Sequence, residues 1–237
     1  MATLSTITFT LGVILVAVGF AAHLGHAVLL ANGRRALAVA RAPQAALAGG
    51  VAGAMSGGVT GSFVVARERA AGDAGLPAAP TALSRVAAWL TIGAFALLGV
   101  SLLSRAIVVQ RGPWGNLYEF SVAFGWSIVG GYLFLARRYP IRQIAFIPAG
   151  IALALLLYAS SLPSAIEELQ PALQNPPLLT VHVGLAVLSY GIFATAFAAG
   201  VGYLAQGTKD RFAWLPSHKV LDEVAYRAIV IGFPVFA

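Results

Sequence analysis

The four histidines are the residues of this chain with the widest chemical range, because the sequence contains no cysteine. A neutral imidazole can donate a nitrogen lone pair to a metal or exchange a proton near neutral pH. His182, and the pair His23 and His26, lie inside long apolar stretches, whereas His218 lies in a basic loop. Without thiols the chain can form neither a disulfide nor a C-x-x-C-H haem attachment site of its own. The histidines in the apolar stretches are therefore the first candidates for a functional site.

The elements that hold these histidines are predicted to be membrane helices. Hydrophobic residues make up 59% of the chain and charged residues only 10%, whereas soluble domains carry about 25% charged residues. The mean hydropathy is +0.85. Several apolar runs reach the roughly 20 residues that a bilayer requires, and they are continuous rather than alternating. The sequence predicts an all-α, polytopic integral membrane bundle with about six spans, at 7–31, 84–109, 115–136, 142–160, 178–206 and 224 onward.

The basic residues predict how this bundle is oriented. Of the 15 lysines and arginines, Arg105 and Arg111 fall on one side of the predicted spans and the other 13 fall on the opposite side. The positive-inside rule places the side with 13 basic residues in the cytoplasm and the N-terminus outside. Basic residues scattered at helix ends also favour membrane topology over nucleic-acid binding as the reason for the net charge of +7.

We divide the chain into a first membrane span (1–31), a cytoplasmic Gly/Ala/Pro-rich connection (32–83) and a membrane domain (84–237). Residues 45–66 are long enough to span a bilayer, but a span there would invert the helices on one side of it. We therefore expect a cytoplasmic or re-entrant segment. The last apolar run opens at Tyr226 and has about 11 residues, too few to cross a bilayer.

The depth of each histidine follows from these spans. His182 lies four residues into the fifth span, near its outer end, whereas His23 and His26 lie near the cytoplasmic end of the first span. At 1.5 Å per residue the two depths differ by roughly 18 Å. Intramembrane ionisable residues mark functional sites by default. The alternative is that each ring only bonds a backbone carbonyl or a neighbouring Ser or Thr, and that His218 is simply solvated.

The loop between the second and third predicted spans is the other candidate region. It reads Arg111-Gly-Pro-Trp-Gly-Asn-Leu-Tyr-Glu-Phe120. Asn116 and Glu119 have the spacing of a capping box for the following helix. Trp114 and Tyr118 fit an interfacial aromatic belt. This leaves Arg105 and Arg111 without an explanation, and an arginine there could clamp an anionic carboxylate.

Three separated segments resemble one known family. They are Gly112-Pro-Trp-Gly-Asn-Leu-Tyr-Glu-Phe120, then Pro171-Ala-Leu-Gln174 with Leu179-Thr-Val-His-Val183 and Leu188-Ser-Tyr190, and finally Leu221-Asp-Glu-Val-Ala-Tyr-Arg227 with Gly232-Phe233. In order and spacing they are similar to the CcsA/ResC family, the haem-handling component of the two-protein cytochrome c synthase of bacteria and plastids. The resemblance covers residues from about 100 to 237.

The resemblance implies a role for His182 as an axial ligand of haem iron at the outer surface. It is similar to the first of the family's two external histidines; the family's W-x-W-D segment and second external histidine do not occur in these 237 residues. Arg111, Trp114 and Tyr118 would then belong to the haem surroundings, with Arg111 facing a propionate. Residues 1–80 match no part of the family pattern, so His23 and His26 are a candidate inner haem site on their position alone. Their depth excludes His23 and His182 as the two axial ligands of one haem.

The resemblance further implies handling and delivery of haem b for covalent attachment to apocytochrome c, as part of a cytochrome c synthase (haem lyase). The implied partners are a ResB/CcsB-like membrane protein, apocytochrome c and membrane lipid. The implied location is the bacterial cytoplasmic membrane or the equivalent plastid membrane. The alternative is a non-enzymatic b-type haem protein or respiratory membrane subunit, which would need a second histidine at the depth of His182; the sequence offers none. A transporter would show an internal repeat, and we find none.

Overall fold

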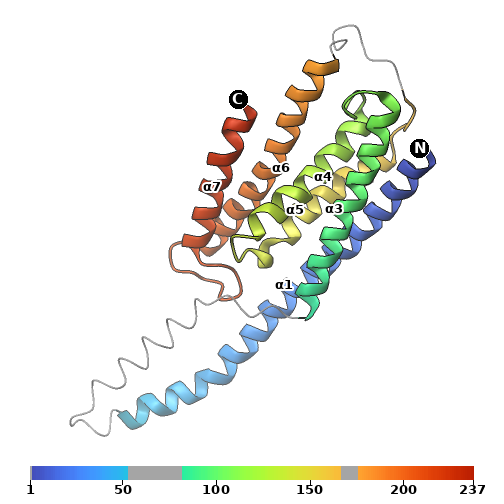
Figure 1. The fold of residues 1–237 in the computed structure, drawn as a ribbon. Coiled ribbons are helices and arrows are strands. Elements are labelled where there is room, and N and C mark those ends of the chain that lie inside the picture. The colour runs from blue at the N-terminus through green and yellow to red at the C-terminus, as the bar shows by residue number, and fades with distance from the viewer. Residues whose placement is uncertain (1, 53–81, 167–175) are drawn as a thin grey trace.

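The computed structural model describes residues 2–52, 82–166 and 176–237 (Figure 1). Every regular element in this part of the chain is a helix, which confirms the all-α prediction. The elements in order are α1 (Ala2–Ala52), α3 (Ala82–Val109), α4 (Leu117–Ala136), the short 3₁₀ helix η1 (Arg142–Ile144), α5 (Phe146–Ser160), α6 (Pro176–Gln206) and α7 (His218–Phe236).

Five of these helical segments are long and apolar enough to cross a membrane. They are Thr3–Arg34, Ala82–Val109, Leu117–Ala136, Arg142–Ser160 and Pro177–Gln206. They correspond to the first five predicted spans. The sixth predicted span is not among them, because α7 carries four charged residues in its first half: Lys219, Asp222, Glu223 and Arg227.

The first helix differs from its predicted length. It continues to Ala52, well beyond Arg34 where its apolar segment ends. The first part of the predicted 32–83 connection is therefore helical. Most of the 45–66 segment, which we expected to be cytoplasmic or re-entrant, falls in residues 53–81 and lies outside the described residues.

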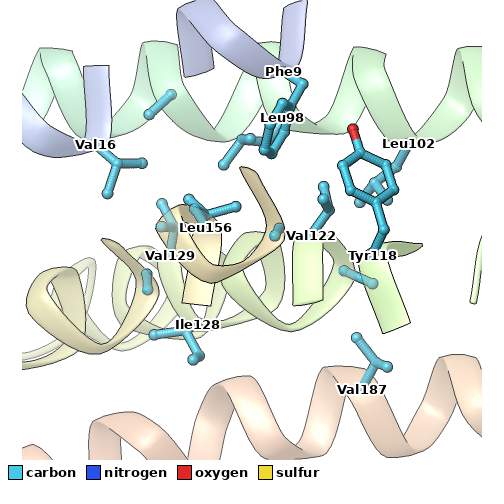
Figure 2. Close-up of a cluster of buried hydrophobic side chains, with 14 residues drawn as sticks. Phe9, Val16, Leu98, Leu102, Tyr118, Val122, Ile128, Val129, Leu156 and Val187 are labelled. Carbon is cyan, nitrogen blue, oxygen red and sulfur yellow. The ribbon is translucent and has the colours of Figure 1, made fainter. Parts of the chain in front are cut away.

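Two clusters of buried apolar side chains hold the bundle together. The first joins α1, α3, α4, α5 and α6, and Leu98 and Leu156 are completely buried at its centre (Figure 2). The second joins the end of α4, η1, α6 and α7 around Ile141 and Leu221. Between membrane helices such packing stabilises through van der Waals contact among side chains rather than through the removal of apolar surface from water.

Small residues let α4 and α6 approach closely. A Cβ atom at Gly131 would collide with the backbone carbonyl of Gly191, and one at Gly191 would collide with the carbonyl of Ser127. Close helix contacts of this kind are favoured between membrane helices, where lipid offers no hydrophobic driving force for association. The contact fixes α6, and with it His182, relative to α4.

The helices alternate in direction, so their termini gather at two ends. One end holds the start of α1, the end of α3 and the starts of α4 and α6, and we call it the outer end. The opposite termini of these helices lie at the inner end. Figure 1 shows both chain termini toward the outer end. Large apolar side chains such as Trp89 and Leu204, which are 73% and 79% exposed, point away from the described helices. Such side chains are suited to lipid contact.

Candidate functional site

The loop between α3 and α4 is built by caps at both sides. α3 ends before Gln110, whose φ of 54° is left-handed and stops the helix. α4 starts after Asn116, whose side-chain oxygen accepts a hydrogen bond of 2.9 Å from the backbone N–H of Glu119. This confirms the predicted N-cap. The other half of the capping box differs from the prediction, because Glu119 Oε2 accepts from the N–H of Gly115 rather than of Asn116.

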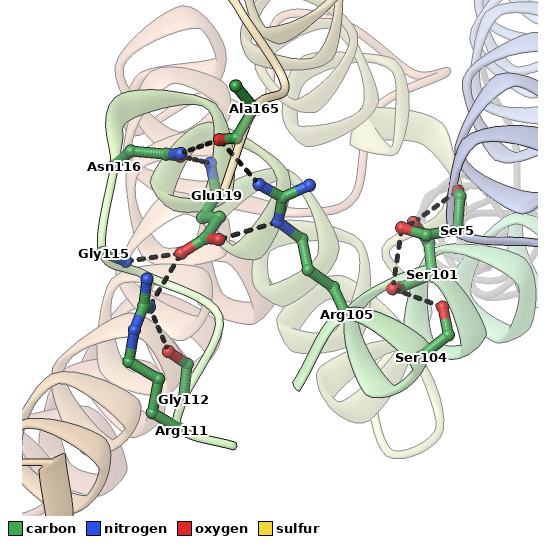
Figure 3. Close-up of polar contacts among 10 residues, drawn as sticks. All are labelled: Ser5, Ser101, Ser104, Arg105, Arg111, Gly112, Gly115, Asn116, Glu119 and Ala165. Atoms are coloured by element: carbon green, nitrogen blue, oxygen red, sulfur yellow. Dashed lines mark hydrogen bonds and ion pairs between the residues drawn. The ribbon is translucent and has the colours of Figure 1, made fainter. Parts of the chain in front are cut away.

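Glu119 is fully buried and binds both arginines of the outer end (Figure 3). Arg105 Nε lies 2.7 Å from Oε1, and Arg111 Nη1 lies 3.0 Å from Oε2. A buried carboxylate requires such partners, because leaving a charge unpaired in a low-dielectric interior is strongly destabilising. The two arginines that the sequence left unexplained are thus both partners of Glu119. A place for Arg111 beside a haem propionate stays a prediction.

The same network reaches the segment after α5. The carbonyl oxygen of Ala165 accepts hydrogen bonds from Arg105 Nη2, at 3.3 Å, and from Asn116 Nδ2, at 3.0 Å. The guanidinium of Arg105 also lies 5.0 Å from the centre of the Tyr118 ring, within range of a cation–π interaction. The network around Glu119 thus joins the end of α3, the loop, the start of α4 and the segment after α5.

Tyr118 itself is a core residue. It is only 7% exposed, and its ring meets Phe9 of α1 edge-on with 5.4 Å between centroids. The aromatic-belt interpretation is therefore wrong for Tyr118. Its packing toward α1 and α3 leaves it on a different side of α4 from the helix that carries His182.

The loop also fixes the first turns of α6. The N–H of Gly112 donates to Thr180 Oγ1 at 2.9 Å, and Trp114 Nε1 donates to the carbonyl of Leu179 at 3.3 Å. A Cβ atom at Gly112 would collide with the indole of Trp114, so only glycine lets the ring lie across the loop. Trp114 is therefore a link between the loop and α6, not only an interfacial side chain.

His182 lies in this fixed stretch of α6 but faces the other way. Leu179 and Val187 on the same helix are buried against the bundle, whereas His182 is exposed. Its neighbours on the outward face, Leu178 and Val181, are 64% and 62% exposed. Within the described part of the chain, no hydrogen bond holds the imidazole. The structure thus fixes the backbone at His182 and leaves the ring available.

His23 has the opposite environment. It is 1% exposed, and its Nε2 lies 3.0 Å from Thr91 Oγ1. Because Thr91 donates its own hydroxyl proton to the carbonyl of Ala87, the ring is assigned as the Nε2–H tautomer that donates to Thr91. Tyr132 covers the ring edge-on at 5.9 Å. This is the Ser/Thr bond that the structural alternative describes.

The inner haem site at His23 and His26 stays a prediction. His23 Nδ1 is buried and has no hydrogen-bond partner among the described residues, and His26 is also buried, at 3% exposure. Tyr132, which touches His23, lies 15 residues beyond Leu117, or about 22 Å along α4. His182 lies beside the loop that precedes Leu117. The two histidine regions are therefore at opposite ends of the bundle, in agreement with the depths read from the sequence.

Two inner-end contacts were not foreseen from the sequence. Gln206 is 1% exposed and closes the loop after α6: its Nε2 donates to the carbonyls of Phe212 and Pro216, and its Oε1 accepts from the N–H of Phe212. The sequence feature that could have indicated this contact is a glutamine at the end of an apolar run. His218, expected to be only solvated, lies 3.1 Å from Asp210 Oδ1. No cluster of three or more His, Asp or Glu side chains suited to a metal ion occurs among the described residues.

Comparison with known proteins identifies a family and relatives of this chain. The family described as Cytochrome C assembly protein matches residues 114–237, slightly more than half of the chain. Protein HemX of Brevibacillus brevis is 29% identical over 160 residues, which cover 64% of this chain and 58% of that protein. Protein HemX of Bacillus subtilis (strain 168) is 28% identical over 160 residues, covering 63% and 57%. The chain therefore spans less than three fifths of the length of these relatives. No solved structure gives a significant match.

Proposed function

Because this chain belongs to the cytochrome c assembly protein family, we propose that it handles haem b for covalent attachment to apocytochrome c at the outer face of the membrane. In this proposal haem is the substrate, and His182 supplies one axial ligand to its iron. The chain acts as the haem-handling part of a cytochrome c synthase (haem lyase). Its location is the bacterial cytoplasmic membrane or the equivalent plastid membrane.

The observation that carries the proposal is the setting of His182. The turn of α6 that precedes it is fixed, since Leu179 and Thr180 are bonded to the 112–114 loop. The imidazole itself is exposed and makes no hydrogen bond to any described residue. A ligand on a rigid element with an uncommitted nitrogen is suited to bind iron without first breaking a protein contact.

The contribution of the protein would be positioning. A fixed axial ligand orients the porphyrin so that its vinyl groups meet the thiols of a C-x-x-C-H segment, which raises their effective concentration. Trp114 and Arg111 contribute by holding the loop that fixes α6, and their place in the haem surroundings remains part of this proposal. A second axial ligand has to come from outside the described face, and the exposed Leu178 and Val181 beside His182 offer a surface for a ResB/CcsB-like partner.

The test is His182→Gly, assayed with and without added imidazole in the host cell. We expect the variant to lose mature c-type cytochrome, detected by haem staining, and to regain part of it when imidazole replaces the missing ring. His218→Gly is the matched control, because His218 lies at the inner end and should leave maturation unchanged. Unchanged maturation together with an unchanged haem absorption spectrum in His182→Gly would make His182 a structural residue.

The haem absorption of the purified variants separates the two functions considered. Loss of bound haem together with maturation supports the delivery function. Loss of bound haem with normal maturation would favour the alternative, a b-type haem protein or respiratory membrane subunit.

A further inference from the structure

A cavity at the outer end lies apart from the face that carries His182. It has a volume of about 250 Å³ and lies between the first turns of α1, the last turns of α3 and residues 164–166. This is far more than the roughly 10–15 Å³ that one water needs. Four hydroxyl side chains line it: Ser5, Thr6, Ser104 and Ser164. Its wall therefore presents several polar groups at the end of two membrane-spanning helices.

The guanidinium of Arg105 completes the polar wall. Arg105 is only 9% exposed, and of its five N–H donors, Nε bonds to Glu119 and Nη2 bonds to the carbonyl of Ala165. Nη1 has no acceptor among the described residues, and Figure 3 shows it beside the bonded Nη2. Arginine presents these donors in a planar fork that matches a phosphate or carboxylate.

The charges around the cavity are unequal. Two guanidiniums, of Arg105 and Arg111, share the single carboxylate of Glu119. Within the described residues, this leaves one positive charge in a largely buried cluster. Burying an unmatched charge is costly, so the arrangement favours an anion on the open side of Arg105.

We propose that this cavity binds the phosphate of an anionic phospholipid from the outer leaflet. The phosphate would accept from Nη1 of Arg105 and from the hydroxyl of Ser164, because Ser5 and Ser104 donate their hydroxyl protons to the carbonyl of Ser101. The apolar lining supports a lipid rather than a small ion: Val108 and Ile166 line the cavity, and Leu4 and Ile107 beside it are 45% and 57% exposed, which provides a surface for acyl chains. The bound headgroup would tie α1 to α3, next to the hydrogen bond between Ser101 Oγ and the carbonyl of Ser5.

The experiment is native mass spectrometry of the full chain in a neutral detergent, titrated with phosphatidylglycerol, phosphatidylcholine or inorganic phosphate. We expect phosphatidylglycerol to bind at least about tenfold more tightly than the other two probes. A difference of this size is what charge-assisted hydrogen bonds between an arginine and an anionic headgroup can provide. Arg105→Lys keeps a positive charge opposite Glu119 but removes the fork, and should weaken phosphatidylglycerol binding about tenfold. Arg111→Lys is the matched control, because it makes the same change at the partner of the other Glu119 oxygen. Arg111 does not line the cavity, so this variant should leave phosphatidylglycerol binding unchanged.

A second variant guards against a folding defect in Arg105→Lys. Ser164→Leu narrows the cavity, leaves both ion pairs of Glu119 intact and should cause the same loss. Equal losses in Arg105→Lys and Arg111→Lys would show that binding depends on the ion-pair network and would overturn the cavity assignment. Equal affinity for inorganic phosphate would overturn the lipid assignment.

The segment that follows Ile166 supplies the remaining test. Glu167 and Glu168 lie outside the described residues and could themselves provide the anion. If the wild-type chain binds no phosphatidylglycerol but the double variant Glu167→Gln, Glu168→Gln does, a carboxylate of the chain fills the cavity and the proposal is wrong.

Discussion

The outer and inner ends of the bundle use charge in opposite ways. At the outer end the charges are few, and Arg105, Arg111 and Glu119 are drawn into one buried network. At the inner end the charges are many, yet side chains such as Arg137 and Lys209 are exposed. The buried polar contacts there are made by neutral groups, above all the side-chain amide of Gln206.

This difference shows that charged residues have two roles, which a count of charged residues alone does not distinguish. Exposed basic residues at one end determine how the protein inserts, because the cytoplasmic side retains lysine and arginine. Buried charges determine which segments meet, because each must find a partner inside the protein. The end with fewest basic residues is therefore the end where each arginine is structurally most important.

Site-specific labelling tests the orientation on which the comparison depends and should give an all-or-none result. Ser164 and Thr208 are both exposed, at the outer and inner ends. Because the chain contains no cysteine, each position can carry a single introduced one. In intact cells, Ser164→Cys should react with a membrane-impermeant thiol reagent and Thr208→Cys should not. The reverse pattern would invert the topology and the proposal for His182.

The next largest effect is expected when the buried carboxylate is removed. Glu119→Gln leaves two buried guanidiniums without a counter-charge, and breaking such a pair typically costs about 3–5 kcal/mol. Glu223→Gln is the matched control, because Glu223 pairs with Arg227 at 2.7 Å with both side chains about half exposed. Exposed pairs contribute about 0–1 kcal/mol. Unfolding in detergent, followed by circular dichroism, should separate the variants; similar losses would mean that burial does not distinguish the two pairs.

Local signals explain which parts of the structure the sequence predicted. Five of the six predicted spans correspond to helices long and apolar enough to cross a membrane, because such a helix is specified by its own run of some 20 apolar residues. The cap at Asn116 was predictable for the same reason, since its hydrogen bond reaches only three residues along the chain. The limits of α1 were missed because a helix can continue beyond its apolar part, from Arg34 to Ala52.

The partners across the bundle could not be predicted. Arg105 meets Ala165, 60 residues away, and Trp114 meets Leu179, 65 residues away. No periodicity in the sequence specifies such pairs, because they depend on how the helices pack. The sequence therefore identified His182 and the 111–120 loop as separate features, and the fold shows that the loop holds the helix on which His182 lies.

The smallest effect is expected at an exposed contact of the inner end. Asp210 Oδ1 accepts from the first N–H of α7, at His218, over 2.7 Å, where the N-cap Ser217 makes no side-chain bond. Burial alone would raise the pKa of Asp210, but the hydrogen bonds from the backbone and ring of His218 lower the pKa below its usual value. A carboxyl whose pKa is lowered by folding stabilises the fold above its unfolded pKa of about 4, and this contribution is lost as the pH falls further.

Asp210→Asn should therefore lower stability slightly at pH 7, by at most about 1 kcal/mol for so exposed a contact. The difference from wild type should shrink as the pH falls below about 4, because protonation removes the charge from Asp210 as well. Asp222→Asn is the control, since Asp222 is exposed and makes no hydrogen bond to a described residue. Thermal unfolding in detergent between pH 7 and pH 3 measures both. A loss at Asp210 as large as that at Glu119 would show that exposed inner-end charges also hold segments together, which would end the distinction between the two ends.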